Sequence, residues 1–142
     1  MREIISSFKE TSNKEFILNF NQDLNPKKIT KSIELVYGLR NFIGNANKFS
    51  FNKIYINLKS NSNFTEIIIS DDGNGYPNDI LSKIGEPYLK SFKQKNKEKA
   101  GLGLGLFIGK TLLEKNFASL NFGNSEILGG AEVIIRWKNK DL

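Results

Sequence analysis

The order of its periodic segments is the feature that most limits the folds open to this 142-residue chain. Apolar residues repeat at helical spacings of three and four over residues 29–49. Residues 51–60 and 64–70 follow at once, with the alternating or β-branched composition of strands, and the turn sequence NSN joins them. A long helix followed directly by a strand hairpin predicts a helix that covers a sheet.

The remaining segments extend this pattern. Residues 78–84 and 104–116 have helical spacing, whereas residues 90–101 are polar, rich in lysine and aperiodic, which predicts a mobile surface loop. Strand-like segments are residues 3–8, 15–20, 51–60, 64–70, 119–123 and 131–137. This order predicts an α/β fold, a two-layer α/β sandwich with helices packed on one face of a mixed sheet.

Length and composition exclude several classes of protein. The length predicts a single domain over residues 1–142, and no internal repeat is visible. The chain has no cysteine and no histidine, which excludes disulfides, thiol chemistry, Ser/His triads and imidazole zinc sites. Since no apolar run approaches the roughly 18 residues of a membrane span, we expect the chain to be soluble.

The positive charge of the chain is concentrated in one segment. A net charge of +6 is compatible with nucleic-acid binding, but five lysines fall within residues 90–99. A basic segment beside a glycine-rich run suits a bound polyphosphate at least as well as a duplex. On composition alone, a solvated surface remains the open alternative.

Polar residues form a second stripe on the predicted helix 29–49. At about 100° per residue, Asn41, Asn45 and Lys48 fall within an arc of about 60°, opposite the apolar stripe. A solvated face explains such a stripe on most helices, yet asparagine is a poor residue for a helix interior. Amide oxygens can ligate Mg²⁺ and lysine can neutralise phosphate. The stripe is therefore a candidate phosphate and metal site.

Two glycine-rich stretches are further candidates. In DDGNG, Asp71 ends an apolar strand, so its carboxylate can accept a hydrogen bond from an exocyclic amine, although Asp-Gly turns are also common in ordinary loops. In GLGLGL, the glycines of residues 101–105 precede the second helix, where backbone amides and the helix dipole favour phosphate. This run lacks the spacing of a Walker A loop or a Rossmann fingerprint.

Together these motifs carry a family resemblance. NFIGNANKF (41–49), DDGNG (71–75), GEPYLKS (85–91) and GLGLGL (101–106) resemble, in order and spacing, the N, G1, F and G2 boxes of the ATP-binding domain of sensor histidine kinases. That superfamily, GHKL, shares the two-layer Bergerat fold with gyrase, the Hsp90 chaperones and MutL. The wording of the last two boxes is most similar to the redox-responsive RegB/PrrB kinases.

The resemblance assigns roles to residues of the chain. It implies that Asn45 binds Mg²⁺, with Asn41 as its partner one turn earlier, that Lys48 contacts phosphate, and that Phe49 lines the nucleotide. It implies that Asp71 recognises the N6 amine of adenine, while Gly73 and Gly75 admit the base. Further nucleotide-binding residues by resemblance, around the lid, are Tyr88, Gly101, Leu102, Gly103, Leu104 and Gly105.

The implied function is a division of labour. The domain would bind ATP and Mg²⁺ and present the γ-phosphoryl to a histidine on a separate dimerisation domain, because this chain has no histidine. The phosphate would pass on to a response regulator. The resemblance implies that the domain lies in the bacterial cytoplasm, whether or not the parent protein has a membrane anchor. It implies no nucleic-acid partner.

Two alternatives stay open at this point. One is a stand-alone protein serine kinase of the anti-sigma-factor type, and the other is an inactive nucleotide-binding interaction domain. A departure from the family pattern is Tyr37, which stands four residues before Asn41 where many relatives carry an acid or amide.

Overall fold

A five-stranded mixed sheet forms one layer of the molecule. The structure, a computed structural model, describes residues 2–21, 32–81 and 97–141, with the backbone alone for residues 2, 21 and 97–104. The strands lie in the order β1-β2-β3-β5-β4, with β1 parallel to β2 and all other neighbours antiparallel. Their bounds are β1 Glu15–Asn21, β2 Lys53–Ser60, β3 Phe64–Asp71, β4 Ser119–Asn124 and β5 Ala131–Lys138.

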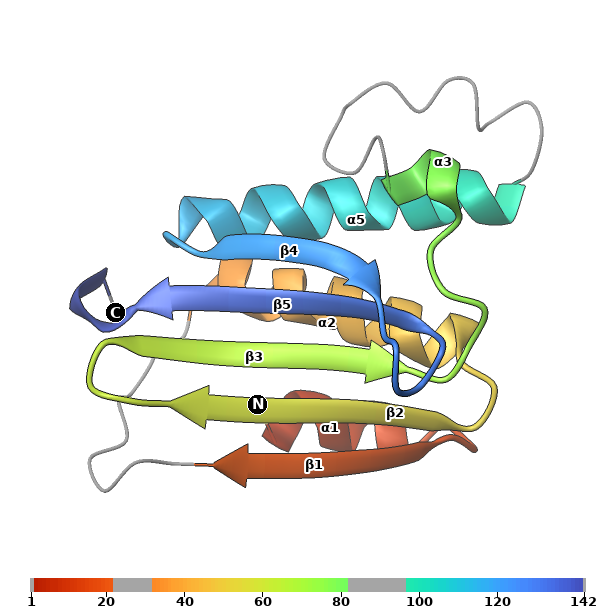
Figure 1. Ribbon diagram of the computed structural model, residues 1–142, viewed down its shortest axis with the longest axis horizontal. Helices are drawn as coiled ribbons and strands as arrows, with labels where there is room; N and C mark the ends of the chain where they lie inside the picture. Colours follow the sequence, from red (N-terminus) through yellow and green to blue (C-terminus); the bar gives the residue numbers. More distant parts are fainter. Residues whose placement is uncertain (1, 22–31, 82–96, 142) are drawn as a thin grey trace.

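Helices form the second layer. Figure 1 shows α1, α2 and α5 behind the sheet, and none of the described helices covers its other face. The bounds are α1 Arg2–Lys9, α2 Ile33–Phe49, α3 Asn78–Leu81 and α5 Lys97–Lys115, followed at the end of the chain by the 3-10 helix η1, Asn139–Asp141. The predicted fold class, a two-layer α/β sandwich with helices on one face of a mixed sheet, is confirmed.

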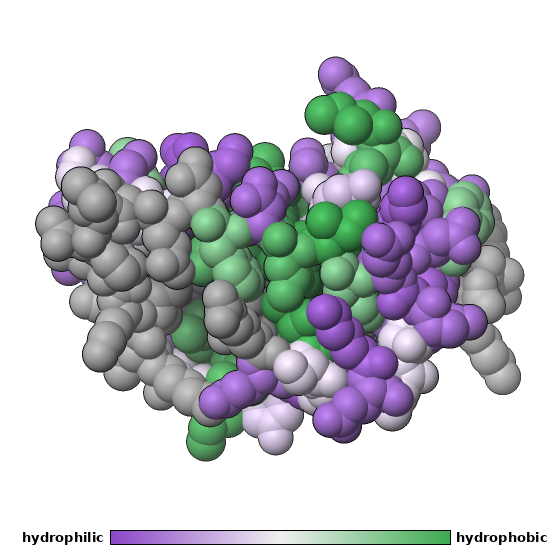
Figure 2. Space-filling model, turned by 90° about the horizontal axis from the view of Figure 1, so that it is seen from below, coloured by the Kyte–Doolittle hydropathy of each residue, from purple (hydrophilic) through white to green (hydrophobic). Residues whose placement is uncertain are grey.

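The core lies between the two layers. Alternate residues of β2, β3 and β5 are buried, and the register places Ile56 opposite Ile69 and Ile69 opposite Val133. The side chain of Trp137, on the same buried face of β5, is 1% exposed. From the β1 edge, hydrophobic residues gather in the middle of the visible face between hydrophilic ones (Figure 2). The alternate, buried side chains of the strands thus pack against the apolar stripe of α2.

Close contact between α2 and α5 depends on glycine. A Cβ atom added at Gly38 would lie 2.7 Å from Cγ of Leu113, and one added at Gly109 would lie 2.8 Å from Cζ of Phe42. Both distances are below any that real Cβ atoms adopt, so each glycine makes room for a large side chain of the other helix.

Two sequence predictions about secondary structure are wrong. Residues 3–8, predicted as a strand, belong to α1, because Ile4, Ile5 and Phe8 fit one face of a helix and Ile5 is buried against the core. Residues 97–101, predicted as part of a mobile loop, belong to α5, so the glycine run lies inside this helix and not before it. The rest of that predicted loop, residues 90–96, falls outside the described residues.

The other predicted elements are confirmed within a few residues. The long helix begins at Ile33, after the N-cap Ser32, whose side chain accepts a hydrogen bond from the backbone N–H of Leu35. Within the described ranges, no helix has the length and hydrophobicity that crossing a membrane requires.

Candidate nucleotide-binding site

Asp71 is a buried carboxylate at the end of β3. Its side chain is 3% exposed, and Oδ1 accepts hydrogen bonds from the backbone N–H of Gly73 (2.9 Å) and of Ala131 (3.2 Å). Burial raises the pKa of this carboxyl above its ordinary value, although the two backbone hydrogen bonds oppose the shift. No described residue donates to Oδ2, which leaves one oxygen of a buried acid for a ligand.

Two glycines allow the backbone to close around this carboxylate. A Cβ atom at Gly73 would lie 2.2 Å from the carbonyl oxygen of Phe49, and one at Gly130 would lie 2.2 Å from both the carbonyl oxygen and Oδ1 of Asp71. Gly73 therefore allows the DDGNG loop to contact the end of α2, and Gly130 allows the start of β5 to contact Asp71.

The neighbouring acid, Asp72, has a structural contact of its own. Its Oδ1 accepts hydrogen bonds from the backbone N–H groups of Phe51 (2.9 Å) and Asn52 (3.0 Å). Desolvation is the largest single influence and raises the pKa of this carboxyl, but hydrogen bonds from Asn52 and other backbone amides together outweigh it and lower the pKa overall. Asp72 thus ties the loop to the α2–β2 connection.

A side chain from β4 holds the second half of the loop. Oδ1 of Asn124 accepts a hydrogen bond from the N–H of Tyr76 (2.7 Å), and its Nδ2 donates to the Tyr76 carbonyl (3.3 Å). Gly75 has φ of +81° and packs on the same amide. Burial, followed by the charge of Asp71, raises the pKa of the Tyr76 phenol, whose ring packs edge-on to Phe122. The sequence analysis missed Asn124.

The polar stripe of α2 faces α5. A Cβ atom at Gly105 would lie 3.3 Å from Nδ2 of Asn45 and 3.8 Å from Oδ1 of Asn41. Nδ2 of Asn41 donates to the Tyr37 carbonyl (2.8 Å), whereas Nδ2 of Asn45 is buried and has no hydrogen-bond partner among the described residues. A buried, unpartnered amide is costly unless a ligand completes it.

Lys48 and Phe49 lie between the two glycine-rich motifs. Nζ of Lys48 is 5.2 Å from the centroid of the Phe49 ring, and the Lys48 side chain is exposed. Since the Phe49 carbonyl touches Gly73, the end of α2 brings the asparagine stripe and the DDGNG loop to one edge of the sandwich.

Some predicted site residues are not placed. Tyr88 lies outside the described residues, and the residues from Gly101 to Leu104 are described only as backbone of α5. The binding roles of all thirteen predicted residues remain predictions. Within the described part of the chain, no cluster of three or more acidic side chains could hold a metal ion.

Known proteins share this sequence pattern. Residues 30–141 match the family described as histidine kinase-, DNA gyrase B-, and HSP90-like ATPase. The sensor histidine kinase RegB of Cereibacter sphaeroides is 38% identical over 102 residues, which are 68% of this chain and 22% of RegB. The chain therefore spans about a fifth of the length of this relative.

Solved structures share the fold. The catalytic domain of histidine kinase ThkA, in a nucleotide-free form, superposes with a TM-score of 0.77 at 22% identity, over 97% of this chain and 90% of that one. Full-length ShkA in complex with AMPPNP superposes with a TM-score of 0.72 at 20% identity, over 96% of this chain and 28% of that one.

Proposed function

Because the chain belongs to the family of histidine kinase-, DNA gyrase B- and HSP90-like ATPases, we propose that it is the ATP-binding catalytic domain of a sensor histidine kinase. The observation that carries the proposal is the buried carboxylate of Asp71, which has one oxygen engaged by backbone amides and one without a described donor. The exocyclic amine of a nucleobase would donate a hydrogen bond to that second oxygen.

Recognition of adenine follows from the chemistry of Asp71. The N6 amine of adenine donates a hydrogen bond, whereas guanine presents a carbonyl at the same position, and its lone pairs would face the carboxylate. A buried acceptor that loses its donor discriminates strongly between two such ligands. Gly73 and Gly75 leave the loop without side chains beside this acid.

The polyphosphate would extend toward α2 and α5. Asn45, with Asn41, would hold Mg²⁺ through an amide oxygen, and Lys48 would offset the charge of the phosphates. When bound, Mg²⁺ neutralises phosphate charge and orients the γ-phosphoryl group. The unpartnered Nδ2 of Asn45 supports a nucleotide at this position, since a phosphate oxygen would accept its N–H while Oδ1 would be left for the metal.

Phosphoryl transfer needs an acceptor from another domain, because the chain contains no histidine. We therefore assign the acceptor to a histidine-bearing dimerisation domain of the same kinase and the next transfer to a response regulator, both in the cytoplasm. The contribution of this domain is positioning and electrostatic stabilisation of the transferred group.

Nucleotide calorimetry with and without Mg²⁺ tests the metal assignment. We expect Asn45→Ala to remove most of the Mg²⁺ dependence of ATP affinity and to leave metal-free binding nearly unchanged. Asn121→Ala, the same substitution at an exposed position of β4, is the matched control. Full Mg²⁺ dependence in Asn45→Ala would show that the polar stripe is only a solvated face.

A transfer assay tests the reaction class. Mixed with radiolabelled ATP and a histidine-bearing helical domain of a RegB-like kinase, the protein is expected to produce acid-labile phosphohistidine. Acid-stable label would indicate phosphoserine and contradict the proposal, and tight ATP binding without any transfer would indicate an inactive nucleotide-binding domain.

A further inference from the structure

The C-terminal end of α5 has an unusual residue in its cap. The N–H of Ala118 donates to the carbonyl of Leu113 (3.1 Å), and the N–H of Phe117 donates to that of Glu114 (3.0 Å). This is the Schellman pattern, in which the residue after the cap adopts a left-handed conformation. Here that residue is Phe117, with φ of +67°. The same cap is fixed from the sheet, since the indole N–H of Trp137 donates to the Asn116 carbonyl (3.1 Å).

Phe117 gains little within the fold in return for this conformation. Glycine or asparagine is the usual residue there, because a Cβ atom disfavours the left-handed region. The Phe117 side chain is 70% exposed, whereas Ala118 and Leu113, the two positions whose apolar contact accompanies this motif, are both buried in the core. A bulky aromatic in an unfavourable, exposed position indicates a role outside the folded chain.

Two hollows of about 280 Å³ each adjoin at this end of the sheet and share Phe64 and Arg136 in their walls. Lys59 lines the first hollow, and Phe117 and Lys138 line the second. We call the surface formed by these five residues the Phe117 surface. It lies at the start of β3, whereas Asp71 lies at the other end of the same strand.

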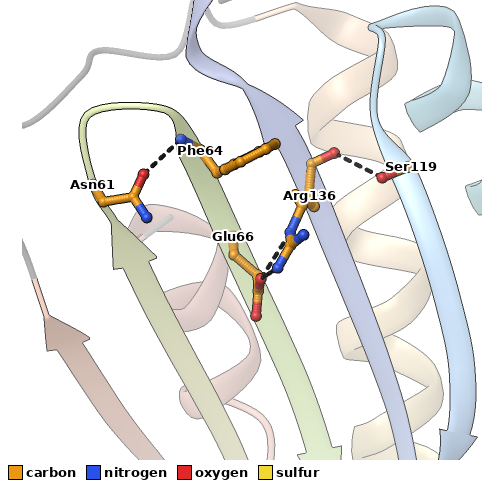
Figure 3. A network of polar contacts seen from close by, with 5 residues as sticks. All are labelled: Asn61, Phe64, Glu66, Ser119 and Arg136. Carbon is orange, nitrogen blue, oxygen red and sulfur yellow. Dashed lines mark hydrogen bonds and ion pairs between the residues drawn. The ribbon is translucent and has the colours of Figure 1, made fainter.

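The arginine at the centre of this surface is held in place. Its Nε and Nη2 both donate to Oε2 of Glu66, at 3.0 and 2.9 Å, and its guanidinium lies 5.0 Å from the centroid of the Phe64 ring (Figure 3). Asn61 fixes the start of β3, since its Oδ1 accepts a hydrogen bond from the N–H of Phe64 (2.7 Å). Rigid aromatic and arginine side chains are those that dominate binding energy at protein interfaces.

We infer that the Phe117 surface binds an acidic segment of another protein that carries a hydrophobic side chain. Its cations are Lys59, Arg136 and Lys138, and Phe117 offers an apolar contact in the hollow that the last two line. Two carboxylates line the same hollows, Glu66, which is paired with Arg136, and Asp141, so three cations face two acids. Nucleic acid fits less well, because a duplex is held by many phosphate contacts, whereas this surface offers three cations, one of which is already paired with Glu66. A second copy also fits less well, because the chain carries a net charge of +6.

The inference goes beyond nucleotide binding and is tested separately from it. The probe is a short synthetic peptide of glutamates around two central leucines, added to the ¹⁵N-labelled protein while amide chemical shifts are recorded. We expect shifts at residues 117–119 and 136–138 and none at residues 71–75. Phe117→Gly, in which glycine suits the left-handed conformation, and Arg136→Gln should each lower the affinity for the peptide by about tenfold. Both should leave ATP affinity unchanged.

Controls separate the sources of binding. A peptide with serines in place of the leucines should bind about tenfold more weakly, and equal binding would overturn the role of Phe117. An absence of shifts at millimolar peptide, or stronger shifts of the same amides by a short DNA duplex, would overturn the inference. So would sedimentation that shows self-association abolished by Phe117→Gly.

Discussion

The two ends of β3 each carry a carboxylate, and the two carboxylates lie in opposite environments. At the end, Asp71 is buried, touches backbone amides and has one oxygen without a described donor. Near the start, Glu66 is bound by the guanidinium of Arg136 on the open face of the sheet. One acid is buried and keeps an oxygen for a ligand, whereas the other is neutralised by a cation on the open face of the sheet. The first arrangement serves a ligand, and the second orders a surface.

The two ends also differ in how the sequence meets the demands of the backbone. Beside Asp71, the crowded or left-handed positions are all glycine, namely Gly73, Gly75 and Gly130. At the end of α5, the left-handed position is Phe117. At the nucleotide end the residue types suit the backbone conformation, whereas at the other end they do not. A residue that does not suit its backbone conformation is expected to serve a function other than folding.

The largest effect is expected from crowding Asp71. In Gly130→Ala the new Cβ would lie 2.2 Å from backbone and carboxylate atoms of Asp71. We expect the free energy of unfolding to fall by about 2 to 3 kcal/mol, measured by urea denaturation, and ATP binding to be lost. In the control Gly123→Ala, the added Cβ has no atom within 4 Å. Equal stability of the two variants would show that β5 does not seat Asp71.

Next in size is the affinity for ATP. Asp71→Asn keeps an oxygen for the backbone donors and removes the charge, so ATP should bind about thirtyfold more weakly, a loss of about 2 kcal/mol. Calorimetry with ATP and with GTP checks this, because the preference for ATP over GTP should shrink together with the affinity. Unchanged affinity would remove Asp71 from the site.

A smaller effect concerns stability without nucleotide. Burial raises the pKa of Asp71 above 3.8 in the folded chain, so its stabilising contribution is full below 3.8 and is lost as pH rises through the folded pKa. The lowered pKa of Asp72 works in reverse, since its contribution is present above 3.8 and is lost as pH falls through the folded pKa.

At neutral pH, Asp71→Asn should therefore raise the free energy of unfolding and Asp72→Asn should lower it. Thermal unfolding from neutral to acid pH measures both, and both differences should vanish in acid, where neither group is charged in either state. Changes of the same sign in the two variants would contradict the opposite environments of these acids.

The smallest effect is expected at the other end of the strand. Phe117→Gly relieves the left-handed conformation and removes only an exposed ring, so the free energy of unfolding should rise by about 0.5 to 1 kcal/mol. Phe117→Ala keeps the Cβ atom and should not gain. A loss of stability in Phe117→Gly would mean that the ring packs within the fold.

Much of the fold could be predicted because its signals are local. The apolar stripe of α2 and the hairpin of β2 and β3 are adjacent in sequence and have clear periods. The strand before α2 was also predicted correctly. Segment 3–8 failed because six residues hold too few apolar positions to separate a helix from a strand. The start of α5 was predicted wrongly because residues 97–101 belong to a polar, lysine-rich stretch without helical periodicity, and the glycines that follow have a low helix propensity. Packing of α5 on α2 through Gly105 and Gly109 overrides that propensity.

The candidate site divides along the same line. Asp71 and the asparagine stripe stand out within their own segments. Asn124 and Gly130 do not, because their contacts to Tyr76 and Asp71 cross about 50 to 60 residues of chain and arise only when β5 pairs with β3 and with β4. A glycine at a turn looks the same whether or not a carboxylate lies against it.

The position of Trp137 decides what light can report about this protein. It is the only tryptophan of the chain, it lies in the core, and its indole is hydrogen-bonded to the cap that precedes Phe117. Its emission should shift to the red on unfolding and respond to events at this end of α5, while nucleotide at the far end of the sheet goes unseen. Intrinsic fluorescence is therefore a built-in probe of the Phe117 surface and a poor one for ATP.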